Sequence, residues 1–262
     1  MSAASPAKGT LYLVPAPLDF GWDAEVALTE VLPDGTLRQA AQLTHWICEN
    51  AKSCRAYLKR IADLHPLALP LQQQQITELP REVHKKGDHG TKGSASFDAR
   101  ALLAPLLAGQ DMGLASEAGM PAVADPGSSV VRAAHELGAR VVPLVGPVSL
   151  LLALAASGLN GQNFAFVGYL PQDAAERAQR LRQLEALALK SGQAQLFIET
   201  PYRNAALWQA LLQHLQPGTR LATAAGLTLA QAQVQSRSVA QWRALNPAPP
   251  DKHLPVVFAL GQ

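Results

Sequence analysis

Residues 112–144, MGLASEAGMPAVADPGSSVVRAAHELGARVVPL, decide the fold class of this chain. An apolar run at 112–115 leads into a loop rich in glycine and proline, and a helical pattern follows over 128–137, where Gly138 is a typical helix end. A second apolar run follows at 140–144. Short apolar runs that alternate with amphipathic helices are typical of a mostly parallel sheet covered by helices on both faces. The stretch therefore predicts an α/β fold.

The same alternation runs through the first half of the chain. Apolar runs at 11–14 and 44–48 predict two further strands. Helical spacing predicts helices over 25–32, 37–43, 54–64 and 97–107. Pro33-Asp34-Gly35 has the composition of a turn, and the Pro- and Gln-rich stretch 66–80 predicts a connection without regular structure.

The pattern changes after Gly158. The second half is predicted to contain strands over 164–169, 194–198, 220–225 and 255–260, helices over 174–189 and 204–215, and a strand or short helix within 234–242. We place a domain boundary near Pro147. The expected organisation is an N-terminal α/β domain over 1–147, whose residues 1–8 are a disordered lead-in, and a C-terminal α/β domain over 148–262.

Composition excludes several classes of protein. The 262 residues have a formal net charge of +2, so the chain as a whole is no polycation and any contact with nucleic acid must be local. Two cysteines exclude a disulfide scaffold. The most apolar stretch, 141–159, is interrupted by Pro143, Gly146 and Pro147, which favours a buried strand, a turn and a buried helix over a membrane span. With a small, polar start that lacks the apolar core of a secretory signal, the expected location is the cytoplasm.

No Walker, dinucleotide-binding, zinc-binding or Gly-x-Ser-x-Gly pattern is present in the sequence. Instead, tight loops follow three of the predicted parallel strands, at 15–18, at 116–121 with 125–127, and at 145–149. Ligands of open α/β sheets sit beyond the carboxyl ends of the strands, so these loops together predict a small-molecule crevice. The glycines of the loops, Gly119, Gly127 and Gly146, are expected to let the backbone approach a ligand closely.

Six stretches carry a family resemblance. They are LYLVPAP at 11–17, LASEAGMPAVADPG at 114–127, VVPLVGP at 141–147, ASG at 156–158, FVGYLP at 166–171 and IETPYR at 198–203. In this order they resemble the tetrapyrrole methylase superfamily of S-adenosylmethionine-dependent methyltransferases, and within it most closely the small-subunit rRNA methyltransferase I group, which methylates a cytidine ribose hydroxyl. The similarity covers residues 9–260.

The resemblance implies a fold, a cofactor and a site. The fold has a mostly parallel sheet in the N-terminal domain and a mixed α/β C-terminal domain, with S-adenosyl-L-methionine bound in a cleft between them, and the protein is usually a homodimer. Carried over by position, the cofactor-binding residues are Pro15, Pro17, Leu18, Ser116, Glu117, Ala118, Gly119, Met120, Ser149, Leu150, Ile198, Glu199, Ala224 and Pro255.

Three segments depart from the rRNA enzymes. Where those enzymes have Glu-Asp-Thr-Arg, this chain has Glu49-Asn-Ala-Lys52, and where they have Asp-Ala-Gly-Thr-Pro it has Glu117-Ala-Gly-Met-Pro121. Their Arg-Glu-Leu-Thr-Lys becomes Ala225-Gly-Leu-Thr-Leu229. Three functions therefore stay open: a methyltransferase acting on RNA, a methyltransferase for a tetrapyrrole-like small molecule, and a cofactor-binding protein that has lost catalysis.

Methyl transfer from a sulfonium needs alignment and no metal, and an alcohol acceptor gains from a base. The candidate bases are Glu117, Glu49 and His84, although Glu117 could instead cap a backbone or contact the cofactor, and the other two could be structural or solvated. The candidate substrate-binding residues are Lys85, Lys86, Lys92, Tyr202 and Arg203. The lysines lie in a polar, glycine-rich loop that could clamp RNA or simply be solvated, and Arg203 could instead pair with a carboxylate.

Overall fold

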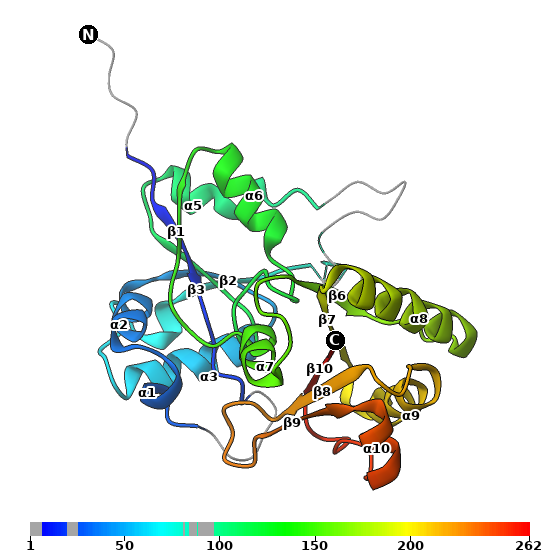
Figure 1. Cartoon of the computed structure of the whole chain (residues 1–262). Helices are drawn as coiled ribbons and strands as arrows, with labels where there is room; N and C mark the ends of the chain where they lie inside the picture. Colours follow the sequence, from blue (N-terminus) through cyan, green and yellow to red (C-terminus); the bar gives the residue numbers. More distant parts are fainter. Residues whose placement is uncertain (1–6, 20–25, 81, 84–87, 89–96) are drawn as a thin grey trace. The chain divides into compact units, whose positions relative to one another are not determined.

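The computed structural model describes residues 7–19, 26–80, 82–83, 88 and 97–262 (Figure 1). The chain divides into two compact units, Met1–Val148 and Ser149–Gln262. Each unit has its own five-stranded sheet. We describe each unit by itself.

The sheet of the first unit is entirely parallel. Its strands are β1 (Thr10–Val14), β2 (His45–Cys48), β3 (Gln75–Glu78), β4 (Met112–Ala115) and β5 (Arg140–Pro143). They lie in the order β3-β2-β4-β1-β5, and all four neighbouring pairs run parallel. All five strands therefore end at the same edge of the sheet, which confirms the predicted α/β class and places the loops that follow these strands along one edge.

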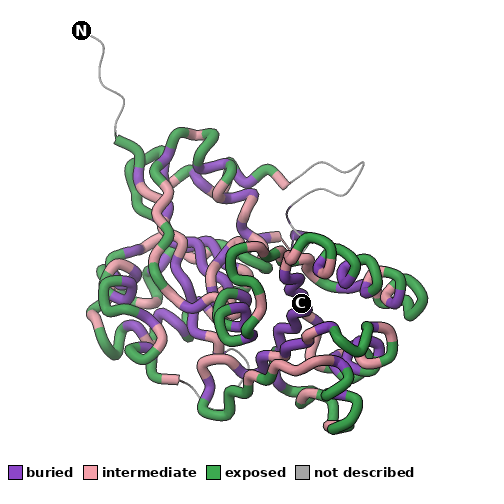
Figure 2. The backbone as a smooth tube through the Cα atoms, in the orientation of Figure 1, coloured by how far each residue is buried: buried purple, intermediate pink, exposed green. Residues whose placement is uncertain are grey.

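Helices cover both faces of this sheet. They are α1 (Leu28–Val31), α2 (Asp34–Gln42), α3 (Ala51–Ala62), α5 (Ala104–Leu107) and α6 (Ser128–Glu136), with short 3₁₀ turns η1 (Leu71–Gln73) and η2 (Arg100–Leu103). Trp46 and Ile47 are adjacent on β2 and point to opposite faces. Trp46 packs with the apolar residues of α2 and α3, and Ile47 packs with those of η2, α5 and α6, so the unit has a buried core on each side of the sheet. Figure 2 marks the buried stretches of the backbone in purple.

The second unit has a mixed sheet. Its strands are β6 (Phe164–Tyr169), β7 (Ala194–Glu199), β8 (Arg220–Ala225), β9 (Gln233–Ser238) and β10 (Val256–Gly261). They lie in the order β6-β7-β10-β8-β9, with β6 and β7 parallel and the other pairs antiparallel. The helices are α7 (Ser149–Ser157), α8 (Ala174–Ser191), α9 (Asn204–His214) and α10 (Val239–Leu245), with η3 (Pro201–Arg203) after β7. The central strand β10 is buried along its whole length.

Two of our sequence predictions were wrong. Pro33-Asp34-Gly35 does not form a turn: α2 begins at Asp34, and Pro33 is the residue before it. Proline fixes its own φ and Asp34 suits the positive end of the helix, so the same residues that suggest a turn also start a helix. The stretch 66–80 is not irregular, because it contains η1 and β3. β3 is an edge strand whose residues are mostly exposed, so it shows no apolar run.

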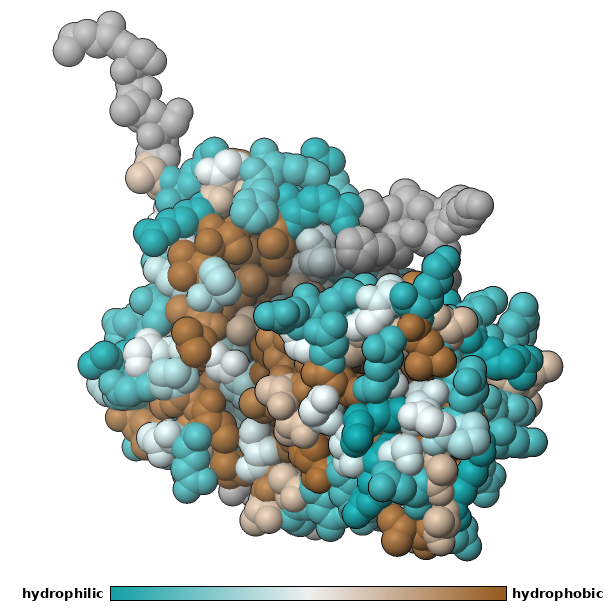
Figure 3. Space-filling view, in the orientation of Figure 1, coloured by the Kyte–Doolittle hydropathy of each residue, from teal (hydrophilic) through white to brown (hydrophobic). Residues whose placement is uncertain are grey.

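Polar side chains cover most of the surface in view, and apolar side chains reach it in patches (Figure 3). Among the exposed apolar residues of the second unit are Phe164, Phe166 and Tyr169, all on the edge strand β6. Within the described part of the chain, no helix combines the length and apolar composition needed to cross a membrane. Of the predicted lead-in 1–8, residues 1–6 lie outside the described residues, whereas residues 7 and 8 are described and Lys8 Nζ donates to the carbonyl oxygen of Leu137. Most of the polar, glycine-rich loop predicted over 84–93 also lies outside the described residues.

Candidate functional site

The three loops of the predicted crevice gather at one place in the first unit. Ala16, after β1, and Gly119, after β4, exchange two backbone hydrogen bonds, with N–O distances of 2.9 and 3.0 Å. A Cβ atom on Gly146, after β5, would lie 2.3 Å from Pro15 Cγ, so the third loop packs directly on the first. The carboxyl ends of three neighbouring strands thus share one continuous rim of backbone.

Two glycines of this rim, Gly119 and Gly127, lie close to protein atoms. A Cβ on Gly119 would meet Leu18 Cδ2 at 3.3 Å, and one on Gly127 would meet Leu114 Cδ2 at 3.1 Å. Both glycines also have positive φ, +74° and +133°, which side chains rarely adopt. Both glycines therefore let the loops bend and pack closely, and our expectation that the rim glycines also let the backbone approach a ligand stays a prediction.

The cofactor-binding candidates of the first unit lie on this rim. Pro15, Pro17 and Ser116 are buried, whereas Leu18 is partly exposed. The candidates Glu117, Ala118 and Met120 are partly exposed as well. The Ser116 hydroxyl is buried and has no hydrogen-bond partner among the described residues. A buried hydroxyl without a partner fits a polar ligand group at this point, since such groups in native proteins are normally satisfied.

A cluster of carboxylates lies at the ends of β2 and β4. Glu49 Oε1 accepts from the backbone N–H of Glu117 at 3.4 Å, and Glu117 Oε1 accepts from Ser53 Oγ at 2.7 Å. Burial first, and then the negative charges of Glu49 and Glu117, raise the pKa of Asp125 to about 7. The three carboxyl groups therefore act on one another electrostatically, and the two candidate bases Glu49 and Glu117 are brought together.

Asp125 is a further candidate base. The sequence analysis did not name it as one, although it named the loop at 125–127 that contains it. A carboxyl with a pKa near 7 can accept a proton close to neutral pH, which a carboxylate with an ordinary pKa does less well. Among the described residues, no group of three or more His, Cys, Asp or Glu side chains is arranged to hold a metal ion. The raised pKa of Asp125 is suited to proton transfer at the rim.

In the second unit, four of the candidates lie at one edge of the sheet. β7 and β8 end there and β10 begins there, because Val257 pairs with Ile198 on one side and with Ala224 on the other. Glu199 ends β7, and the carbonyl oxygen of Pro255 accepts from the N–H of Gly226 at 3.1 Å. The remaining candidates, Ser149 and Leu150, begin α7. The structure thus groups Ile198, Glu199, Ala224 and Pro255.

Glu199 and Arg203 bind each other. The Glu199 side chain is 1% exposed, and its Oε1 forms an ion pair with Arg203 Nη2 at 2.7 Å and accepts from the N–H of Thr200 at 2.7 Å. Arg203 thus pairs with a carboxylate, as one interpretation of the sequence anticipated. Tyr202 is different: it is 77% exposed, and the Arg203 guanidinium lies 5.8 Å from its ring centre.

His84, Lys85, Lys86 and Lys92 lie outside the described residues, so their roles stay predictions.

Asp88, which lies between Lys86 and Lys92 in the sequence, is described and buried. Its carboxylate accepts from the N–H of Gly127 at 3.0 Å and of Ser129 at 2.6 Å, and from Ser128 Oγ at 2.8 Å, at the N-terminus of α6. Burial acts to raise the pKa of Asp88, but these hydrogen bonds outweigh it and lower that pKa. The sequence analysis did not predict these hydrogen bonds of Asp88 to the N-terminus of α6.

The sequence is similar to proteins of known activity. Residues 36–241 match the family described as Tetrapyrrole (Corrin/Porphyrin) Methylases. A "Ribosomal RNA small subunit methyltransferase I" of Mesorhizobium japonicum is 33% identical over 212 residues, which cover 81% of this chain and 61% of that protein. A protein of the same name from Escherichia coli O157:H7 is 33% identical over 184 residues, covering 70% of this chain and 54% of that protein. The chain thus spans little more than half the length of these relatives.

Solved structures share the fold. A uroporphyrin-III-C-methyltransferase from Thermus thermophilus superimposes with a TM-score of 0.52 at 20% identity, over 97% of this chain and 94% of that one. The methyltransferase CobJ superimposes with a TM-score of 0.53 at 16% identity, over 98% and 94% of the two chains. At such identities the likeness concerns the arrangement of helices and strands.

Proposed function

Because this chain belongs to the tetrapyrrole methylase family, whose members use S-adenosyl-L-methionine, we propose that it transfers a methyl group from this cofactor to RNA. The proposed acceptor is a ribose hydroxyl of ribosomal RNA. The observation that carries the proposal is the family match over 36–241, which contains two of the three rim loops, together with relatives that are named as rRNA methyltransferases.

The chain's own rim would hold the cofactor. When bound, S-adenosyl-L-methionine supplies a methyl group already activated by its sulfonium, so the protein has mainly to bind, orient and exclude water. Backbone groups of the loops at 15–18 and 116–120 present the polar contacts, and the buried Ser116 hydroxyl offers a partner that the described protein residues leave unused. We assign the second unit's grouped residues, Ile198, Glu199, Ala224 and Pro255, to the same role.

A proton must leave the acceptor hydroxyl. We propose that the rim carboxylates receive it, and that Asp125, with a pKa of about 7, joins the candidate bases Glu117, Glu49 and His84. Glu49 and Glu117 also act indirectly, because their negative charges help to keep Asp125 basic. The RNA contacts are assigned to Lys85, Lys86 and Lys92, with the exposed Tyr202 ring as a surface on which a base can stack.

Two further parts of the proposal concern assembly and place. We propose a homodimer, supported by the exposed apolar side chains Phe164, Phe166 and Tyr169 on the edge strand β6. An rRNA acceptor would place the protein in the cytoplasm.

Arg203 is proposed to support Tyr202 rather than to bind RNA itself, because Arg203 already forms an ion pair with Glu199.

The test is transfer of labelled methyl from S-adenosyl-L-methionine to isolated small ribosomal subunits. We expect label in the rRNA, and less of it for Lys85→Ala combined with Lys86→Ala. Label that enters a tetrapyrrole precursor but no RNA would support a small-molecule methyltransferase. Cofactor binding measured by calorimetry without transfer to either acceptor would indicate a protein that binds the cofactor without catalysis, a reading that the altered segments at 49–52 and 225–229 kept open.

A further inference from the structure

Helix α3 carries three polar side chains on one face. Ser53, Tyr57 and Arg60 follow one another at spacings of four and three residues, which places them in one row along the helix. Elsewhere on the helix, Leu58 and Ile61 are fully buried in the core between α3 and the sheet. A polar row on such a firmly packed helix needs partners, and the structure provides one for each side chain.

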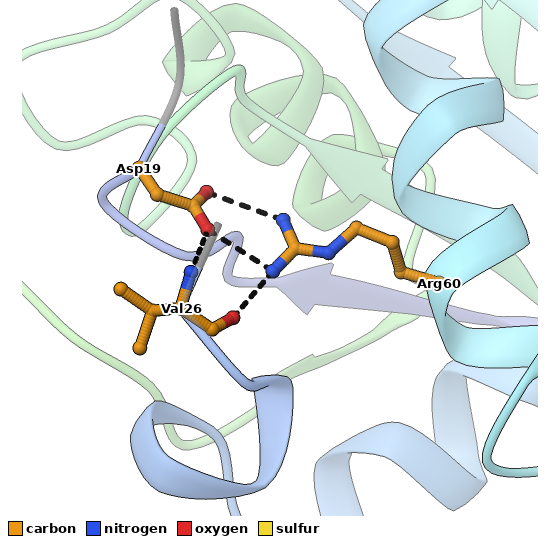
Figure 4. Close-up of polar contacts among 3 residues, drawn as sticks. All are labelled: Asp19, Val26 and Arg60. Carbon is orange, nitrogen blue, oxygen red and sulfur yellow. Dashed lines mark hydrogen bonds and ion pairs between the residues drawn. The ribbon is translucent and has the colours of Figure 1, made fainter. Parts of the chain in front are cut away.

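Two members of the row contact the loop after β1. The Tyr57 hydroxyl donates to the carbonyl oxygen of Pro15 at 2.8 Å, and the pair is buried. Burial raises the pKa of Tyr57, so the phenol keeps its proton and stays a donor. Arg60 donates through Nη1 and Nη2 to Asp19 Oδ1 and Oδ2 at 3.2 and 3.0 Å, and Nη2 also donates to the carbonyl oxygen of Val26 at 2.6 Å (Figure 4).

Asp19 completes this group from the loop itself. Its Oδ2 accepts from the N–H of Val26 at 2.9 Å, and the residue is only 6% exposed (Figure 4). A bidentate arginine–carboxylate pair of this kind fixes both distance and orientation. The stretch that begins with Pro15 and ends with Asp19 is therefore held to α3 at both ends.

The third member, Ser53, contacts the other rim loop. Its hydroxyl donates to Glu117 Oε1 at 2.7 Å. The start of α3 is itself fixed, because the Asn50 side chain accepts from the N–H of Lys52 at 2.9 Å and Glu78 Oε1 accepts from the N–H of Ala51 at 2.6 Å. One rigid helix thus contacts the loops after β1 and after β4 at three points.

We propose that Ser53, Tyr57 and Arg60 are positioning residues that hold these two loops at the spacing the methyl donor requires. The inference rests on the proposed function, because it takes the loops to be the cofactor site. Loops of this kind lose ligand affinity when their supporting contacts are removed, since binding must then also order the loop. The row adds a determinant of cofactor affinity that makes no contact with the cofactor.

The experiment compares cofactor affinity with stability in matched variants. Tyr57→Phe and Ser53→Ala each remove one hydroxyl, and Arg60→Lys keeps the charge but loses the two-pronged contact. We expect each to raise the Kd for S-adenosyl-L-methionine, measured by calorimetry on the full chain, by about five- to tenfold. Ser53→Thr, which keeps the hydroxyl, should restore near wild-type affinity.

The control variant is Gln74→Met. It removes the buried hydrogen bond from Trp46 Nε1 to Gln74 Oε1, which is 3.1 Å long. Gln74 directly precedes β3, so this bond lies toward the amino ends of the strands, away from the rim loops. We expect it to lower the melting temperature and leave the Kd unchanged. Row variants that lower the melting temperature but bind the cofactor as tightly as wild type would overturn the positioning role alone. A wild-type chain that binds no cofactor would overturn the proposed site as well.

Discussion

Asp125 combines burial with two negative neighbours, and its pKa of about 7 lies well above the ordinary value of 3.8. The folded protein therefore binds this proton more tightly than the unfolded chain does. The contribution of Asp125 to the free energy of unfolding therefore falls as the pH rises from about 4 to about 7 and levels off above it. The negative charge of Asp125 therefore destabilises the folded state at neutral pH, and such perturbed groups are typical of functional sites.

Replacing Asp125 by Asn removes that charge. We expect the variant to be more stable than wild type at pH 8, and the gain to shrink as the pH falls to about 4, because one pKa unit corresponds to about 1.4 kcal/mol. Urea unfolding at several pH values measures the difference. Asp63→Asn, at the exposed end of α3, controls for the loss of one negative charge. A gain for Asp125→Asn that is the same at every pH would contradict this assignment.

Among the elements, most strands were predictable because they are apolar and short. The strand at 164–169 and the one at 220–225 have the bounds that the sequence predicted. β3 was missed, because a half-exposed edge strand has no apolar pattern to recognise. The start of α2 was missed because Pro, Asp and Gly occur in both turns and first helical turns, and only tertiary packing separates the two.

The corrected start of α2 leads to a prediction about Gly35, which lies inside the helix. Nothing lies within 4 Å of a Cβ added there. Because glycine costs entropy in a helix, we expect Gly35→Ala to stabilise the protein by about 0.4–1 kcal/mol. Gly192 is the matched control. An added Cβ there would also have room, with its nearest neighbour Asn160 Nδ2 at 3.8 Å, but Gly192 caps the end of α8 with a φ of +67° that a side chain disfavours. Gly192→Ala should destabilise, as judged by denaturation midpoints, and a stabilising effect of the same size at both positions would contradict the reasoning.

For the whole molecule, the position of the rim loops could be predicted from the sequence, but the side-chain contacts and the carboxyl pKa that give the rim its chemistry could not. The loops after β1 and β4 could be expected at one edge, because parallel strands end together. The contacts that shape the rim could not, since Tyr57 and Pro15 are 42 residues apart and Ser53 and Glu117 are 64 apart. Asp125 was missed for the same reason: its pKa depends on burial and on charges that only the fold brings near.

The proposed homodimer makes a prediction about the edge strand β6. Phe166 is exposed at 36% in the single chain and lies between the exposed Phe164 and Tyr169. We expect Phe166→Glu to shift the protein toward monomer in sedimentation velocity, while its melting temperature changes little. Leu245→Glu, which alters an exposed apolar residue at the end of α10, is the control. A wild-type chain that is monomeric at high concentration would contradict the proposal.

The proposed function requires that the loops after β1 and β4 hold S-adenosyl-L-methionine. Hydrogen–deuterium exchange with and without the cofactor measures whether they do. We expect slower exchange in peptides that span residues 15–18 and 116–120 when the cofactor is present. Exchange that is unchanged in both peptides at a cofactor concentration that saturates binding would contradict it.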